Sequence, residues 1–264
     1  MPSARPKVDF YGHYAYLILH FPILRRRGFG EKTDEEVDFV IGKEFLITVR
    51  YGAVEGMSIF EKSFEMESLL GRGDGASHAG ILFFDMMKKL YETAFFQTER
   101  IKDSVVDIER KIFLGHEREM VFQLSKTNRD LIDFRRAISL HKDTLESFEV
   151  ISGKIFGDDY RFFIRAIMGE YQKVEKAVRN NNEYVIELRD TNDALLNTKQ
   201  NQIMQFLTVV AFIGMPLTII TALLQIDTVS RPIIGQENDF WIITGALIAL
   251  GLGMYVFFKK KKWL

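Results

Sequence analysis

Two long apolar runs near the C-terminus dominate the hydropathy pattern of the chain. They cover residues 206–224 and 240–258, and neither contains a formally charged side chain. Each run is about 19 residues long, and a helix with a rise of 1.5 Å per residue needs about 20 residues to cross the hydrocarbon layer of a bilayer. The pattern therefore predicts a transmembrane helical hairpin with a connecting loop at residues 225–239.

Helical periodicity also dominates the stretch that precedes the first apolar run. Pro216 is the one proline in residues 79–224, and glycines are few there. We expect long helices over residues 81–113, 117–148 and 156–224, the last of which continues into the membrane. A helix of about 70 residues measures about 100 Å and needs neighbours that bury its apolar stripe.

The first 78 residues show shorter periods. Residues 14–21 are typical of a strand, residues 36–41 and 45–51 alternate like a hairpin, and residues 57–70 predict a helix. The segment Gly71-Arg72-Gly73-Asp74-Gly75 interrupts the pattern. It favours a flexible connection over a phosphate-binding loop, because no Gly-Lys-Ser/Thr follows it.

These patterns define the expected organisation. The fold class is an α+β cytoplasmic domain with long helices, followed by a two-helix C-terminal transmembrane hairpin. We expect a small α/β region at residues 1–78, a long-helix region at 79–205, the hairpin at 206–258 and a basic tail at 259–264.

A stripe of small and polar side chains follows one face of the last predicted long helix. A lipid-facing surface has no use for asparagine and threonine, and a tight helix dimer does not normally place an aspartate in its seam. The stripe therefore favours a pore lined by several copies of the chain. A polar seam in a non-conducting bundle remains the alternative. Alternate steps of four and three residues give its members, here called the polar stripe: Asp190, Ala194, Asn197, Asn201, Met204, Thr208, Ala211, Met215, Thr218, Ala222 and Gln225.

Charge placement predicts the topology. The tail Lys259–Lys262 is expected to stay in the cytoplasm by the positive-inside rule, and two spans then place the N-terminus there too. The first 25 residues show no signal-peptide pattern. The loop at 225–239 lies on the other side, where Glu237 and Asp239 either attract cations before entry or are ordinary solvated loop residues.

Further composition narrows the function. The chain has no cysteine, and its five histidines are scattered without metal-ligand spacing. The cluster Arg25-Arg26-Arg27 is more typical of a solvated surface than of a nucleic-acid site. We therefore expect no enzyme, no cofactor and no nucleic-acid partner. On the second span, Gly245, Ala249 and Gly253 form a ridge for close helix packing, while Trp241 and Trp263 are expected as interfacial anchors.

The C-terminal motifs resemble the CorA magnesium channels. The spacing agrees through the last hundred residues, and the long helices are of the expected type. The N-terminal region resembles that of the family only in its general α/β type. The matching residues are Asn201-Gln202-Ile203-Met204, Leu207-Thr208, Met215-Pro216-Leu217-Thr218 and Tyr255-Val256-Phe257-Phe258-Lys259-Lys260-Lys261-Lys262-Trp263-Leu264.

The resemblance implies a funnel-shaped homopentamer in the cell membrane that conducts magnesium or another divalent cation. It implies a pore-lining role for Asp190 and Asn197, and a polar ring at the cytoplasmic mouth for Asn201. The hydrophobic constriction would contain Met204 and Leu207. Further pore positions would be Thr208, Met215 and Thr218.

Two departures from the family pattern affect function. The Gly-Met-Asn signature of the family falls at Gln225-Ile226-Asp227, so Asp227 is expected to form a charged outer selectivity ring and to be the metal-binding residue. Ala166 stands where the family has an aspartate of its magnesium-sensing interface, so gating by cytoplasmic magnesium is expected to be weak or absent. The leading hypothesis is a CorA-like divalent-cation channel, possible for magnesium, cobalt, nickel or zinc; the alternative is a non-conducting CorA-like membrane scaffold.

Overall fold

The computed structural model describes residues 5–23, 33–69, 78–226, 238–261 and 263. The chain divides into two compact units, Met1–Asn192 and Asp193–Leu264. The long helix α5 (Arg161–Leu224) contributes to both units. The predicted break at residues 71–75 and the cluster at residues 25–27 lie outside the described residues.

A four-stranded antiparallel sheet forms the start of the first unit, with the order β1-β2-β3-β4. Its strands are β1 (Lys7–Phe10), β2 (Tyr14–Pro22), β3 (Asp34–Gly42) and β4 (Leu46–Arg50). Alternate residues of β2 and β3, such as Leu19 and Phe39, point to the helices and are buried. Phe39 of β3, for example, packs edge-on against Phe83, and Phe83 packs against Phe148. Residues of the opposite face, such as Ile18 and Asp38, are buried as well.

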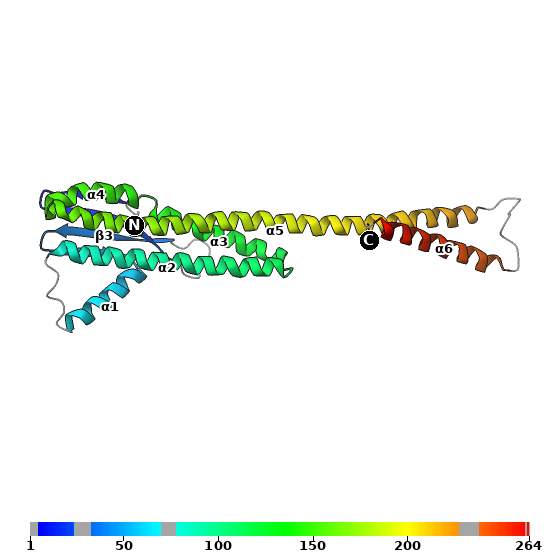
Figure 1. Cartoon of the computed structure of the whole chain (residues 1–264), viewed down its shortest axis with the longest axis horizontal. Coiled ribbons are helices and arrows are strands. Elements are labelled where there is room, and N and C mark those ends of the chain that lie inside the picture. The colour runs from blue at the N-terminus through cyan, green and yellow to red at the C-terminus, as the bar shows by residue number, and fades with distance from the viewer. Residues whose placement is uncertain (1–4, 24–32, 70–77, 227–237, 262, 264) are drawn as a thin grey trace. The chain divides into compact units, whose positions relative to one another are not determined.

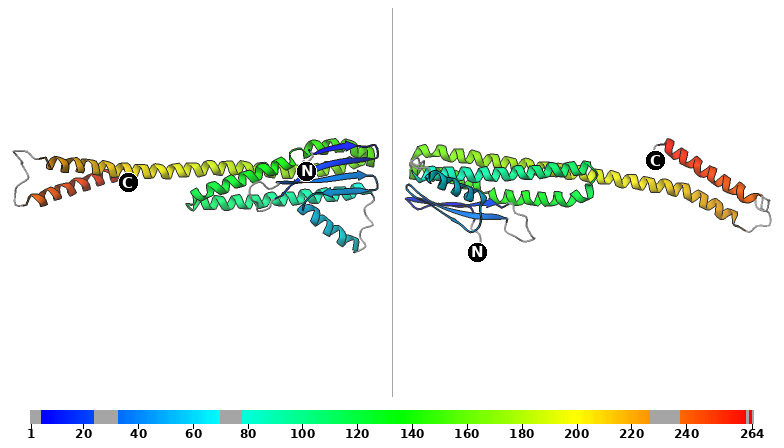
Figure 2. Two further views of the ribbon diagram at one scale, coloured as in Figure 1. Left: turned by 180° about the vertical axis from the view of Figure 1, so that it is seen from behind. Right: turned by 90° about the horizontal axis from the view of Figure 1, so that it is seen from below.

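Helices α2 (Ala79–Phe113), α3 (Glu117–Ile138) and α4 (His141–Phe156) pack on this sheet, and Figures 1 and 2 show the arrangement. The first unit also contains α1 (Glu55–Leu69) and the start of α5. Helix α1 packs against α2, and Gly56 allows the close approach because a Cβ there would lie 3.0 Å from Leu90 Cα. Helices α2 and α5 are joined by a buried hydrogen bond, in which Asn181 Nδ2 donates to the Thr98 carbonyl at 2.8 Å.

The predicted helix over residues 117–148 is wrong in two respects, because the structure has two helices there and the second continues to Phe156. Helix α3 ends at Ile138 and α4 begins at His141. Ser139 closes α3 with a hydrogen bond from its hydroxyl to the Arg136 carbonyl at 3.0 Å. No proline or glycine marks this break, so local sequence did not reveal it.

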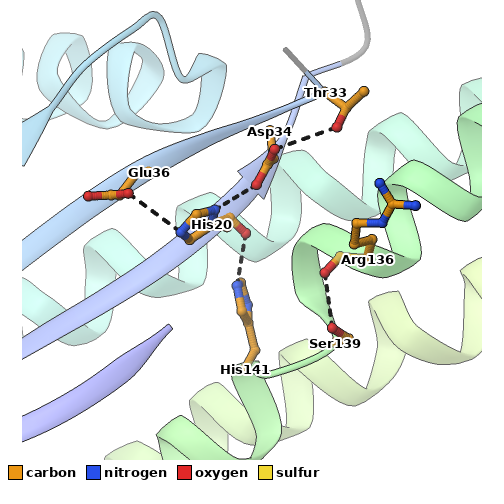
Figure 3. A network of polar contacts seen from close by, with 7 residues as sticks. All are labelled: His20, Thr33, Asp34, Glu36, Arg136, Ser139 and His141. Atoms are coloured by element: carbon orange, nitrogen blue, oxygen red, sulfur yellow. Dashed lines mark hydrogen bonds and ion pairs between the residues drawn. The ribbon is translucent and has the colours of Figure 1, made fainter. Parts of the chain in front are cut away.

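His141 links the break to the sheet (Figure 3). The imidazole is fully buried, and its Nε2 donates to the His20 carbonyl of β2 at 2.8 Å. Nδ1 of the neutral ring then accepts from the Tyr91 hydroxyl at 2.9 Å. The His20 ring itself lies between Asp34, at 2.6 Å, and Glu36, at 3.7 Å. His141, the first residue of α4, therefore joins this helix to β2 and to α2.

The second unit contains the C-terminal part of α5 and helix α6 (Asp239–Lys260). Two helices, Asp158–Leu224 and Asp239–Lys260, are long and apolar enough to cross a membrane by length and composition. They agree with the hairpin that the sequence predicts. Strand β1 and the short 3₁₀ turn Asp158–Tyr160, by contrast, were not predicted.

We expect acid to destabilise the first unit through His141. Burial lowers the pKa of His141 to about 3, well below the unfolded value of about 6.5. Because the folded pKa is the lower one, the stabilisation is complete above about pH 6.5 and falls as the pH drops towards 3. At pH 5 this residue alone accounts for a loss of about 2 kcal/mol.

Hydrogen exchange at the amides of β2 and α4, followed between pH 7.5 and pH 5, measures this loss. The control is His141→Gln, which retains a donor and an acceptor but cannot titrate. Its opening free energy should change less with pH than that of the wild type, by about 2 kcal/mol at pH 5. An equal pH dependence in the two proteins would contradict the role assigned to His141.

Candidate functional site

In the second unit, α5 packs against α6 through one face only. Val209 is 1% exposed, and Leu217 Cδ1 would lie 3.6 Å from a Cβ on Gly251 of α6. The rings of Phe212 and Phe258 are 6.4 Å apart between centroids. This packing face of α5 is completed by Ile213, Pro216 and Ile220, which are half-buried.

The polar stripe lies on the other side of α5. At 100° per residue, its members are centred nearly opposite the packing face. Within the chain they are therefore left without a packing partner, and most are exposed. The exposed predicted pore residues are Asp190, Asn197, Asn201, Met204, Leu207, Thr208, Met215 and Thr218.

The threonines of the stripe are bonded within their own helix. Thr208 Oγ1 donates to the Met204 carbonyl at 2.7 Å, and Thr218 Oγ1 donates to the Gly214 carbonyl at 2.9 Å. Each hydroxyl proton is thus committed to the backbone, and the oxygen lone pairs remain free to accept. A hydroxyl in this state suits the water shell of a cation, because that shell presents hydrogen-bond donors.

Asp190 belongs to the first unit and also lies on an exposed face of α5. Leu188 and Asn192, two residues away on either side, are buried. Since two residues correspond to about 200° around a helix, Asp190 points away from the packed side.

The stripe spacing continues further upstream than sequence reasoning recognised. Glu187, Glu183, Asn180 and Lys176 follow the same steps of three and four residues, and all four are exposed. The spacing alone carries this signal, but upstream of Asp190 long charged and polar side chains replace the small residues that make the stripe recognisable.

The outer end of α5 carries the residues predicted for the selectivity ring. Gln225 and Ile226 are exposed just beyond Leu224, and their amides donate to the carbonyls of Ala222 and Leu223 at 3.2 and 3.3 Å. Asp227 and Glu237 lie outside the described residues. Asp239 begins α6, and its Oδ1 accepts the Phe240 amide at 2.7 Å, a favourable place for a negative charge.

The small-residue ridge of α6 does not face α5. A Cβ added to Gly245 or Gly253 would meet no atom within 4 Å. Gly251, which the spacing of four excludes, is the glycine that approaches α5. The ridge is therefore open to a helix of another chain or to lipid.

The described part of a single chain contains no group of three or more histidine, aspartate or glutamate residues able to hold a metal ion. Ala166 is exposed on α5 and has no side-chain oxygen.

The candidate membrane helix α5 has a polar face that does not pack against α6, and it continues from an α+β unit with long helices. This combination is typical of a membrane transport protein. This chain belongs to the CorA-like Mg²⁺ transporter protein family, whose sequence model matches residues 1–260. CorA-like proteins are ion transporters and not enzymes.

Individual relatives extend this result. The cobalt/magnesium transport protein CorA of Thermotoga maritima is 22% identical over 260 residues, which cover 98% of this chain and 73% of the relative. The complete structure of the CorA magnesium transporter from Methanocaldococcus jannaschii matches with a TM-score of 0.83 at 17% identity, covering 98% of this chain and 80% of that one. The full-length CmaX protein matches with a TM-score of 0.72 at 15% identity, covering 100% and 79%.

The opposed faces of α5 predict a pattern of chemical accessibility. The chain has no native cysteine, so single cysteines can report on each face. We expect Thr208→Cys and Thr218→Cys to react with a water-soluble, membrane-impermeant thiol reagent at least about ten times faster than Val209→Cys and Ile213→Cys, because only a hydrated thiol forms the reactive thiolate. Equal rates in the protein reconstituted in lipid would contradict a hydrated stripe.

Proposed function

We propose that the chain forms a homopentameric channel for divalent metal cations, with the polar stripe of α5 facing the central pathway. The single observation that carries this proposal is the exposed stripe of acceptors on the side of α5 opposite the α6-packing face. Lipid would leave hydroxyl groups such as those of Thr208 and Thr218 poorly solvated, whereas a water-filled path would hydrate them. Membership of the CorA-like Mg²⁺ transporter protein family supports the same interpretation.

The need for several copies follows from the exposure of α5. Every residue from 197 to 208 is exposed in the single chain. An isolated helical stretch gains little stability from its own hydrogen bonds and depends on packing partners. Further copies of the chain are the partners that a symmetric assembly supplies. The number five rests on the resemblance to CorA channels.

In this channel the ion passes with much of its water shell. Magnesium loses water reluctantly, so amide and hydroxyl acceptors that hold the shell act better than direct ligands. Asp190 attracts cations at the cytoplasmic side, and Asn201 forms the polar ring at the mouth. Met204 and Leu207 form a hydrophobic constriction that closes by excluding water. Thr208, Met215 and Thr218 line the deeper path.

The outer ring differs from the family signature. Five copies of Asp227 would bind a divalent cation more tightly than five neutral acceptors, and conduction requires that the ion also leave. We infer that the ring shifts selectivity among magnesium, cobalt, nickel and zinc. The proposed topology places both termini in the cytoplasm, with Trp241 and Trp263 at the two ends of α6.

Ion uptake into proteoliposomes tests the proposal. Magnesium, cobalt, nickel and zinc are supplied separately to vesicles that contain the wild type or Asp227→Ala. We expect uptake of at least one divalent ion by the wild type and a change in rate or ion preference of about tenfold in the variant, since replacing five charged acceptors alters binding at the mouth by at least 1.4 kcal/mol. Absence of uptake from a well-formed oligomer would instead favour the scaffold alternative.

Gating by magnesium is tested separately. Because Ala166 cannot supply an oxygen ligand at the position of the family's sensing aspartate, we expect no closure at ordinary cytoplasmic magnesium concentrations. Ala166→Asp is the matched variant, and it should gain sensitivity to magnesium. Currents recorded from lipid bilayers over a magnesium titration measure both proteins, and closure of the wild type would refute the expectation.

A further inference from the structure

A basic groove lies between α2 and α5 on the surface of the first unit. Its volume is about 520 Å³, and it is open to solvent on one side. The residues that matter for its chemistry are Phe95, Lys102, Lys173, Lys176, Asn180 and Tyr184. Asn180 and Lys176 also lie on the upstream continuation of the stripe spacing, but neither the transport proposal nor the family motif assigns a role to the groove.

The floor and walls of the groove are held in place by hydrogen bonds. The buried Asn181 donates from Nδ2 to the Thr98 carbonyl at 2.8 Å, which fixes α5 on α2. Tyr184 donates from its hydroxyl to Glu109 Oε2 of α2 at 2.5 Å. A ligand therefore meets a preformed groove and does not have to order it.

The charge of the groove is opposite in sign to that of the whole chain. Three lysines and one carboxylate, that of Glu99, line it, whereas the chain carries a net charge of −1. Lys102 lies 3.5 Å from Glu99, and Lys173 lies 2.7 Å from Glu170. Exposed ion pairs of this kind contribute at most about 1 kcal/mol to stability, so a multivalent anion can take the place of the carboxylate beside each lysine. Among the described residues, no ion pair involves Lys176.

The spacing of the lysines selects an extended anion. Helices α2 and α5 run in the same direction, since Tyr160 bonds Gly80 and Asn181 bonds Thr98. Lys176 precedes Asn181 by five residues, and Lys102 follows Thr98 by four. At 1.5 Å per residue, the two lysine backbones are separated by about 13 Å along the groove. A single phosphate group reaches one end, whereas a chain of phosphates with flexible lysine stems reaches both.

We propose that the basic groove binds a polyphosphate group, carried either by a nucleoside triphosphate or by an inorganic polyphosphate. Lys173 and Lys176 hold one end of the phosphate chain and Lys102 holds the other. Asn180 offers an amide donor between them. The rings of Phe95 and Tyr184 provide apolar surface against which a nucleobase can lie.

Equilibrium dialysis of the full-length purified protein tests this proposal without measuring transport. The probes are ATP, inorganic tripolyphosphate and AMP. The test variant combines Lys102→Gln, Lys173→Gln and Lys176→Gln. The control combines Lys62→Gln, Lys88→Gln and Lys126→Gln, three exposed lysines outside the groove, and has the same net charge.

We expect ATP and tripolyphosphate to bind at least about ten times more tightly than AMP. The test variant should weaken both by at least about 30-fold, since hydrogen bonds from three charged donors are lost. The control should bind like the wild type. Tighter binding of ATP than of tripolyphosphate would assign the nucleoside triphosphate, and equal binding would assign the inorganic chain.

A second variant, Ala177→Phe, narrows the groove without changing its charge and should also weaken binding. The triple-lysine test variant and Ala177→Phe are both checked for thermal unfolding and oligomeric state. Three results would overturn the proposal: no polyphosphate binding by the wild type, equal binding by the test and control variants, or equal binding of AMP and tripolyphosphate. Loss of the oligomer in the test variant without any binding by the wild type would show that the groove is an interface between copies.

Discussion

The packing of α5 against α6 through a single face is the constraint on which the membrane unit depends. Because Val209 and Leu217 of α5 pack towards α6, α5 has one side left for polar side chains and two flanks for bulky apolar side chains. The polar stripe occupies that remaining side. Polar groups in a membrane helix need water or a polar partner. In the proposed channel, further copies of the chain enclose a hydrated space along the stripe, and packing within the hairpin leaves that face for ions.

In the first unit, hydrogen bonds of buried polar groups hold the long helices on a small sheet and on one another. His141 joins β2 to α2 and α4, and Asn181 joins α5 to α2. A buried polar group left unpaired costs about 1–3 kcal/mol, so these bonds restrict the register in which the helices can pack. The Asn181 bond also joins the two helices that form the walls of the basic groove.

Local signals predicted the parts of the structure that local forces determine. The membrane hairpin follows from two uninterrupted apolar runs, and the hairpin of β3 and β4 follows from alternation around Gly42. The break between α3 and α4 was not predictable in this way, because no proline or glycine marks it and the contact of His141 beside it is with a strand distant in sequence. Strand β1 was missed because it has only four residues, too short a run for the alternation of its charged and apolar side chains to stand out. For the candidate site, the spacing identified the stripe, while its opposition to α6 required the packing of Gly251 and Leu217.

The chemistry along α5 changes with depth in a way that electrostatics explains. Outside the membrane run the exposed face carries carboxylates such as Glu187 and Asp190, where water screens their charge. Within the run the acceptors are neutral, and the threonine protons are bonded to the backbone. A carboxylate at that depth would cost several kcal/mol in desolvation and would hold a divalent cation tightly. The free-energy cost of desolvation is smaller for neutral oxygens, and they release the ion more readily. In the proposed channel, the charged groups concentrate cations at the ends while the neutral stripe lets them pass.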